Sequence, residues 1–272
     1  MSEARTPFAN RASAAHRATA GLFIAGTDTG VGKTLVSVSI VRALVARGLE
    51  VAAMKPVAAG ASTTAQGPRN ADALALAGAA SVAAPYDRIN PYCLRAPISP
   101  HIAATDEGLA IDLAVIRQRF GQLAQAADCV IVEGAGGWLA PIGDRETLAD
   151  VARALSLPVV LVVGLRLGCL NHALLSARAI EADGLELAGW IGNAIDPDFD
   201  RTAENVASLE QRLGSAPLAL VPHLYRAEVR ALAREVSPAE APLEQGIVLP
   251  FEAGEALLTL CASGPVRRTG AG

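Results

Sequence analysis

The sequence predicts an α/β fold, a single domain built on one parallel β-sheet with helices on both faces. Two observations predict it. Short apolar runs recur along the 272 residues, each ended by Gly, Pro, Asn or a charged residue, and helical patterns alternate with them. Continuous apolar strands that are separated by helices are typical of a parallel sheet buried on both faces. Such sheets bind ligands at the carboxyl ends of their strands.

The expected elements follow one another along the chain. The strands are the apolar runs at 22–25, 51–54, 129–132, 159–163, 187–191 and 218–221. The helices are the segments with helical periodicity at 34–47, 72–77, 113–126, 148–155, 171–182 and 201–213. The sequence has no internal repeat and no linker-like change of composition. We therefore expect one domain at 21–261, with a disordered tail at 1–20 and a polar tail at 262–272.

Bulk composition narrows the functional classes. Hydrophobic residues make up 51% of the chain, which provides a core and excludes a disordered protein. The net charge of −4 leaves no basic footprint for nucleic acid. No apolar run approaches the roughly 18 residues of a membrane span, and residues 1–20 lack the apolar stretch of a secretory signal. The four cysteines lie far apart without a C-x-x-C pair. We expect a soluble, cytoplasmic protein.

A glycine-rich segment at 26–34, Gly-Thr-Asp-Thr-Gly-Val-Gly-Lys-Thr, joins the first strand to the first helix. In that context backbone N–H groups converge on an anion, and the helix N-terminus adds about half a positive charge. Lys33 can reach the outer phosphates of a nucleotide, and the Thr34 hydroxyl can ligate Mg²⁺. Five residues separate Gly26 from Gly32, one more than in a standard Walker loop. The alternative is a glycine-rich turn with a chance lysine; we favour a nucleotide site of the P-loop NTPase type.

Polar residues follow several of the expected strands. Lys55 comes directly after 51–54, where it could neutralise charge during phosphoryl transfer or merely extend from the sheet into water. Glu133 follows 129–132 and precedes glycines, as a Walker-B acid does. Asp72 begins a short helix, which is equally typical of a structural helix-start acid. Thr34, Asp72 and Glu133 carry oxygen atoms of the kind that Mg²⁺ prefers as ligands.

The histidines are weaker signals. His101 could line a pocket or be structural, and His172 lies on an expected helix where packing is the simpler role. No pair of histidines has the spacing of zinc ligands. Asn193 follows the strand at 187–191, and Pro222 follows the strand at 218–221, so both belong to the rim of strand ends where we expect one shared site.

Taken in order, these motifs resemble the ATP-dependent dethiobiotin synthetases of biotin synthesis. The resemblance covers about residues 21–224 and includes the unusual loop spacing. Its remaining motifs are Lys55-Pro56-Val57, 69–74, Asn90-Pro91-Tyr92, Ser99-Pro100-His101, 133–138, 167–172 and 189–193.

The resemblance implies a seven-stranded parallel sheet, a homodimer with sites near the subunit interface, and a reaction. 7,8-Diaminononanoate takes up CO₂ (supplied by bicarbonate) on one amine, the resulting carbamate attacks the γ-phosphate of ATP, and the neighbouring amine closes the ring. The products would be dethiobiotin, ADP and phosphate, with Mg²⁺ as the cofactor.

The resemblance also implies residue roles. The triphosphate cradle would comprise Gly30, Val31, Gly32, Lys33, Thr34 and Leu35. The Mg²⁺ ligands would be Thr34, Asp72 and Glu133, and the catalytic groups Lys33 and Lys55. Other nucleotide contacts would come from Glu133, Gly134, Ala135 and Gly136, and the adenine pocket from Asn193, Ala194, Pro222, His223 and Leu224. The substrate would contact Thr29, Lys55, Ala59 and, near its carboxylate, Asn171.

Two positions depart from the family pattern. Gly30 stands where the family often has Glu, and Ala59 stands where a serine hydroxyl faces the substrate. The second change removes a hydrogen bond worth about 1 kcal/mol, which backbone groups or Ser62 could replace.

Two other families remain as alternatives. A ParA/MinD-like partitioning ATPase would share the sheet and the loop, but it carries a lysine where this loop has Asp28. A ligase that amidates cobyrinic acid would normally carry a glutaminase domain, and no Cys/His/Glu arrangement of that kind follows residue 224.

Overall fold

The central element is a six-stranded sheet with the strand order β10-β9-β8-β1-β7-β2. The structure is a computed structural model, and the residues that it describes are 21–223, 257 and 259. Every pairing within this sheet is parallel. Its strands are β1 (Gly21–Gly26), β2 (Val51–Met54), β7 (Cys129–Glu133), β8 (Val159–Leu165), β9 (Leu187–Ala194) and β10 (Ala219–Val221). All six expected strands are therefore present.

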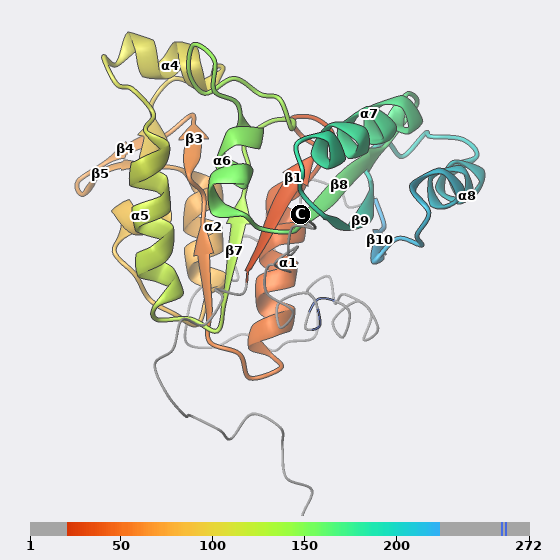
Figure 1. Cartoon of the computed structure of the whole chain (residues 1–272), viewed down its shortest axis with the longest axis horizontal. Helices are drawn as coiled ribbons and strands as arrows, with labels where there is room; N and C mark the ends of the chain where they lie inside the picture. The colour runs from red at the N-terminus through yellow and green to blue at the C-terminus, as the bar shows by residue number, and fades with distance from the viewer. Residues whose placement is uncertain (1–20, 224–256, 258, 260–272) are drawn as a thin grey trace, which may run out of the picture.

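Helices cover both faces of this sheet (Figure 1). Alternate residues of β1 point to opposite faces, so that Leu22 and Ile24 belong to one core cluster and Phe23 to the other. The first cluster includes residues of α1 (Lys33–Val45) and α2 (Ala71–Ala79). The second includes residues of α5 (Leu113–Ala124), α6 (Leu148–Leu155), α7 (Cys169–Ala182) and α8 (Thr202–Leu213). The predicted three-layer fold is confirmed.

Several predicted bounds need correction. The strand expected to end at Ile191 continues through Asn193 to Ala194, because β9 pairs with β8 over its whole length. The helix expected to reach Arg47 ends at Val45. The described residues contain six strands of the main sheet, one fewer than the seven that the resemblance implies. The two expected tails, His16, Leu224 and Cys261 lie outside the described residues.

A segment between β2 and α5 contains short elements that the sequence did not predict. Strands β3 (Val57–Ala59) and β6 (Tyr92–Leu94) form a parallel pair, and β4 (Ser62–Thr64) and β5 (Gly67–Arg69) form an antiparallel pair. Helices α3 (Tyr86–Ile89) and α4 (Pro100–Asp106) complete the segment. In Figure 1, α4 and the β4–β5 pair lie beyond the main sheet, at the upper left. This segment lies beside the carboxyl ends of the strands of the main sheet.

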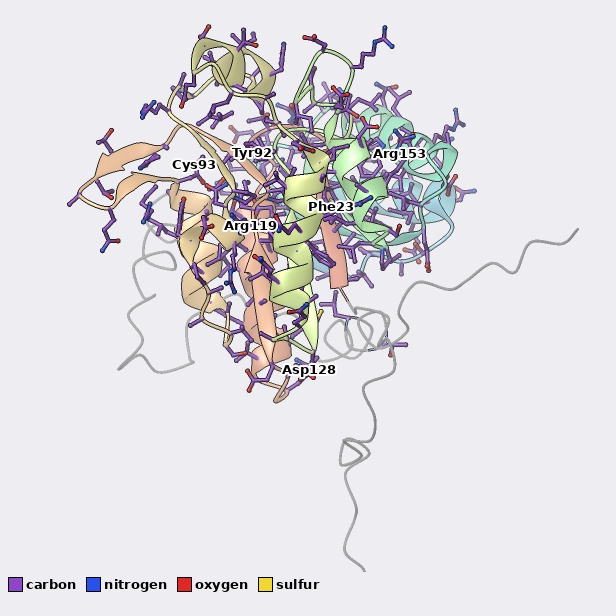
Figure 2. All side chains as sticks on the ribbon, turned by 60° about the vertical axis from the view of Figure 1, so that its left-hand side comes forward. Phe23, Tyr92, Cys93, Arg119, Asp128 and Arg153 are labelled. Atoms are coloured by element: carbon purple, nitrogen blue, oxygen red, sulfur yellow. The ribbon has the colours of Figure 1, made fainter. Side chains whose placement is uncertain are left out.

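The polarity of the sheet sets where a ligand can bind. Figure 2 shows Asp128, which directly precedes β7, at the opposite end of the molecule from Tyr92 and Cys93. The carboxyl ends of the parallel strands therefore face the short elements of the β2–α5 segment. No helix in the described residues is both long enough and apolar enough to traverse a lipid bilayer.

Candidate functional site

The loop between β1 and α1 forms an open turn at the carboxyl end of β1. Gly30 and Gly32 have φ values of 76° and 87°, a left-handed backbone that glycine adopts without strain. The Val31 carbonyl accepts a hydrogen bond of 2.8 Å from Asn193 Nδ2, so β9 fixes the loop from the side. A Cβ added to Gly32 would lie 2.1 Å from the same nitrogen, so only glycine fits here. The loop leads directly into the N-terminus of α1, and a helix N-terminus favours an anion.

Lys33 is nearly enclosed, with 7% of its surface exposed. Its Nζ donates to the Asp28 carbonyl at 2.8 Å. Burial, with the nearby charge of Lys55, lowers the pKa of Lys33 to about 8. The Asp28 carboxylate meanwhile pairs with Arg166, with Nη2 and Oδ2 2.6 Å apart. Asp28 thus joins the loop to the segment that follows β8.

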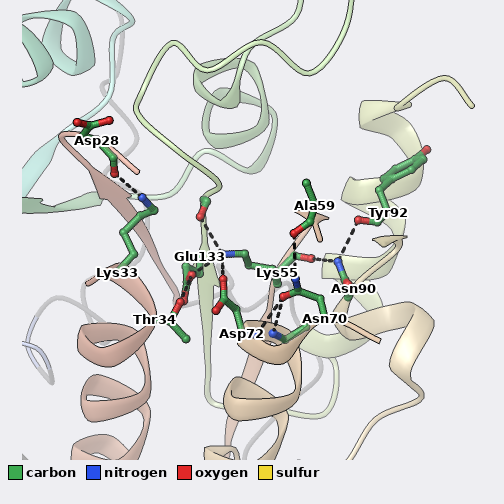
Figure 3. Close-up of polar contacts among 12 residues, drawn as sticks. Asp28, Lys33, Thr34, Lys55, Ala59, Asn70, Asp72, Asn90, Tyr92 and Glu133 are labelled. Carbon is green, nitrogen blue, oxygen red and sulfur yellow. Dashed lines mark hydrogen bonds and ion pairs between the residues drawn. The ribbon is translucent and has the colours of Figure 1, made fainter. Parts of the chain in front are cut away.

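Lys55 is the centre of a second cluster, drawn in Figure 3. Its Nζ donates to Asp72 Oδ2 at 3.1 Å, to the Gly134 carbonyl at 3.3 Å and to Glu133 Oε1. Lys55 is 3% exposed and Glu133 is fully buried. Burial acts to lower the pKa of Lys55, but the charges of Glu133 and Asp72 outweigh it and raise that pKa. The ammonium therefore stays charged within the protein.

Glu133 links this cluster to the phosphate loop. Its Oε1 accepts a hydrogen bond of 2.8 Å from the Thr34 hydroxyl at the start of α1. Its Oε2 is buried without a hydrogen-bond partner, which is costly for a carboxylate oxygen. Among the described residues, no group of three or more His, Cys, Asp and Glu side chains is placed to hold a metal ion. A cation here would therefore be held by two carboxylates, Glu133 and Asp72, with the Thr34 hydroxyl and oxygens from outside the protein. This donor set fits Mg²⁺.

The structure brings the principal predicted residues together. Lys33, Thr34, Lys55, Asp72 and Glu133 come from four separate segments and lie in one polar cluster (Figure 3). Asp72 is in the first turn of α2, as expected.

Other predicted residues lie around this cluster. A Cβ at Gly136 would be 3.5 Å from Thr29 Oγ1, so the glycine-rich segment after β7 approaches the phosphate loop. His223 Nδ1 lies 3.2 Å from the Ala194 carbonyl, and Ala194 and Pro222 line a cavity of about 600 Å³ beneath α8. Asn171 is exposed in the first turn of α7, and no contact in the described part of the chain joins it to the cluster.

Sequence reasoning missed several residues that support the site. Asn70 caps α2, and the preference of N-cap positions for Asn was the available signal. Arg166 follows a buried strand, just as Lys55 does, but its partnership with Asp28 spans 138 residues and leaves no local pattern. Asn90 donates to the Lys55 carbonyl and Tyr86 accepts from the Asn70 N–H, and their residue types alone do not indicate this role.

The chain also resembles known proteins. The AAA domain model matches residues 20–228. A protein of Xanthomonas oryzae named ATP-dependent dethiobiotin synthetase BioD is 50% identical over 212 residues, which cover 78% of this chain and 95% of that protein. The chain belongs to the dethiobiotin synthetase family. Dethiobiotin synthetases of the same name from Pseudomonas aeruginosa and Aromatoleum aromaticum are 50% and 52% identical, over 93% and 92% of their lengths and 78% and 76% of this chain.

Two solved structures with low sequence identity resemble this member of the dethiobiotin synthetase family in fold. The cell division ATPase MinD of Pyrococcus furiosus aligns with a TM-score of 0.54 at 17% identity, over 89% of this chain and 99% of that one. A ParA family ATPase of Chlorobium tepidum aligns with a TM-score of 0.51 at 12% identity, over 90% of this chain and all of the other. These likenesses confirm the predicted P-loop NTPase fold.

Proposed function

We propose that this protein is a dethiobiotin synthase, an ATP- and Mg²⁺-dependent cyclo-ligase acting on 7,8-diaminononanoate and CO₂. The observation that carries the proposal is the convergence of Lys55, Glu133, Asp72 and Thr34 beside the phosphate loop that bears Lys33. Membership of the dethiobiotin synthetase family supports the choice of substrate.

The reaction has three steps. One amine of the substrate adds to CO₂ and loses a proton, which gives a carbamate. A carbamate oxygen attacks the γ-phosphorus of ATP, so that a P–O bond forms, the bond to ADP breaks, and a carbamic-phosphoric anhydride results. The second amine attacks the carbamoyl carbon, loses a proton and expels phosphate, which closes the ring. Because this last attack is intramolecular, the protein has mainly to hold the carbamate and the γ-phosphate in line.

The two lysines supply positive charge where the phosphoryl group is transferred. Lys33 lies at the start of α1 and would contact the outer phosphates once its bond to the Asp28 carbonyl is exchanged for an anion. Lys55 would face the carbamate and the transferring phosphoryl group from the opposite side. Its raised pKa keeps it a cation at neutral pH. Preorganised cations in a pocket sheltered from water stabilise developing charge more than they would in solvent.

Thr34, Asp72 and Glu133 would hold Mg²⁺. When bound, the cation would neutralise phosphate charge and orient the triphosphate. The partnerless Oε2 of Glu133 supports this assignment, because a cation would satisfy the buried oxygen.

The remaining assignments complete the proposed complex. Thr29, Ala59 and Asn171 would contact the diamine, and Asn193, Ala194, Pro222, His223 and Leu224 would surround the adenine. Backbone groups or Ser62 would replace the missing serine hydroxyl. We propose that the enzyme is a cytoplasmic homodimer. Leu167, just before α7, and Leu175, in the middle of α7, are 88% and 58% exposed, which supports an interface there.

The test is product formation from defined substrates. Purified protein would be incubated with ATP, Mg²⁺, bicarbonate and 7,8-diaminononanoate, and ADP and dethiobiotin would be measured. We expect ADP release to require both the diamine and bicarbonate, in equal amounts with dethiobiotin. A matched control is 8-aminononanoate, which can form a carbamate but lacks the amine that closes the ring. ATP turnover that is indifferent to diamine and bicarbonate would instead favour a partitioning switch like the MinD and ParA proteins that share the fold.

A further inference from the structure

The hydroxyl of Tyr86 lies between two asparagines from separate segments. It accepts a hydrogen bond of 2.8 Å from the Asn70 backbone N–H and donates one of 3.0 Å to Asn90 Oδ1. Asn70 and Asn90 are 6% and 2% exposed, so water does not compete freely for these groups. The Arg69 guanidinium lies 4.2 Å from the centre of the Tyr86 ring and holds the ring from one side.

Asn90 fixes the backbone that carries Lys55. Its Nδ2 donates to the Lys55 carbonyl at 2.7 Å and to the Tyr92 carbonyl at 3.1 Å (Figure 3). The Lys55 N–H in turn donates to the Ile89 carbonyl at 2.8 Å. The turn after β2 is therefore bound on both sides to the segment that contains Asn90.

Asn70 fixes the backbone that carries Asp72. Its Oδ1 accepts from the Asp72 N–H at 3.0 Å and from the Ala73 N–H at 3.3 Å, which makes it the N-cap of α2. Its Nδ2 donates to the Ala59 carbonyl at 3.2 Å and ties the cap to β3 (Figure 3). The Asp72 side chain itself is 45% exposed and contacts Lys55 alone among the described interactions. Its position therefore depends on how α2 begins.

We propose that Tyr86 is a positioning residue that holds the start of α2 against the turn after β2, and so keeps Asp72 beside Lys55. The proposal rests on the proposed function in one respect, because it takes Asp72 to be a ligand of Mg²⁺. Without the phenolic oxygen, the Asn70 N–H and Asn90 Oδ1 would both lose their partner in a buried setting. The two segments would then relax independently, and the metal site would lose its shape.

The first test compares Tyr86→Phe with Tyr92→Phe. The Tyr92 hydroxyl also bridges to another segment, because it accepts from the Asp112 N–H at 2.8 Å, but that bond lies away from the cluster. We expect Tyr86→Phe to raise the Mg²⁺ concentration for half-maximal turnover about ten-fold, a typical effect for a residue that orients metal ligands. Nucleotide affinity without Mg²⁺ should stay at the wild-type value in both variants. Equal Mg²⁺ dependence in Tyr86→Phe and Tyr92→Phe would overturn the proposal.

A second test needs neither nucleotide nor turnover. Lys33 and Lys55 are the only lysines in the sequence, so protein labelled with ¹³C-lysine gives two side-chain NMR signals. We expect Tyr86→Phe to shift the Lys55 signal toward its position in Asp72→Asn, and the double variant to match Asp72→Asn. Shifts that simply add would mean that Tyr86 does not act through Asp72 and would contradict the proposal. Because no substrate is present, this result is independent of whether the proposed reaction is correct.

Discussion

At the scale of single residues, two buried lysines in one pocket have pKa values shifted in opposite directions. Burial dominates at Lys33, whose nearest polar partner is the neutral carbonyl of Asp28, and its pKa falls to about 8. At Lys55 burial is outweighed by Glu133 and Asp72, and the pKa rises. Lys55 therefore stays a cation at neutral pH, whereas the charge of Lys33 depends on pH until an anion binds.

This difference predicts a pH dependence of nucleotide binding. The Lys33 ammonium is present below its pKa of about 8 and is lost as the pH rises through that value. We expect the ATP affinity of the free wild-type protein, measured without Mg²⁺, to fall about ten-fold between about pH 7 and about pH 9. Lys33→Arg keeps its charge over this range, so its affinity, although weaker, should be flat. Parallel profiles for the two proteins would show that another group titrates.

Replacement of Lys55 should lower the rate of turnover more than the affinity for ATP. We expect Lys55→Gln to bind ATP within about two-fold of wild type but to turn over about 100-fold more slowly, because charge on the transferring group is no longer neutralised. Arg117→Gln removes a positive charge from the exposed side of α5 and should leave both values unchanged. Because Lys55→Gln leaves Glu133 without its cation, thermal unfolding would be measured alongside, with Lys55→Arg as a variant that keeps the charge. Unchanged turnover in Lys55→Gln would remove its proposed role.

At the scale of elements, the β1–loop–α1 unit depends on Gly32, where both the left-handed backbone and the nearby Asn193 side chain require glycine. Gly32 has a φ of 87°, and a Cβ there would meet Asn193. Gly48, at the other end of α1, has a φ of 84° with open space around it. Both Gly→Ala variants should lose about 1 kcal/mol of stability through backbone strain, and Gly32→Ala should lose more because its Cβ clashes with Asn193.

Only Gly32→Ala should lose ATP binding, because it alone displaces Asn193 from the loop. Equilibrium unfolding of the two variants measures the loss of stability, and nucleotide titration measures the effect of displacing Asn193 on ATP binding. A Gly48→Ala variant that bound ATP equally poorly would assign the loss to general destabilisation instead.

The sequence identified long elements better than short ones. Strands such as β2 and β7 are buried on both faces, so their apolar runs are visible without any knowledge of their neighbours. Strands β3 to β6 have three residues each, too few to show a period, and the residues of β4 are all exposed. Strands β3 and β6 form by pairing with each other across more than 30 residues, and β4 and β5 form a local antiparallel pair.

The residues of the candidate site were likewise only partly predictable from the sequence. Lys55 and Glu133 were found because a charge directly after a buried strand is conspicuous. The proposed positioning role of Tyr86 was not found from the sequence, because it depends on hydrogen bonds to Asn70 and Asn90 that only the folded chain brings together.

At the scale of the whole molecule, the proposed ligand would join segments that the fold leaves separate. The cluster takes Thr34 from α1, Asp72 from α2 and Glu133 from β7, and these approach one another at one rim of the sheet. A ligand that binds only this assembled rim stabilises the fold by mass action, by about 2.7 kcal/mol at 100 times its dissociation constant.

We therefore expect Mg²⁺ with ATP to raise the melting temperature by several degrees, and EDTA to remove most of the increase. Glu133→Ala should respond less to Mg²⁺ at fixed ATP. An increase in melting temperature that was insensitive to EDTA would indicate that the nucleotide binds without the metal.

The near-complete enclosure of both lysine side chains has a practical consequence. All other basic residues of the sequence are arginine or histidine, so its outer surface carries guanidinium groups but no lysine amine. Reagents that acylate amines should therefore modify Lys33 and Lys55 only slowly in the folded protein. The rate of that acylation would report how often the pocket opens.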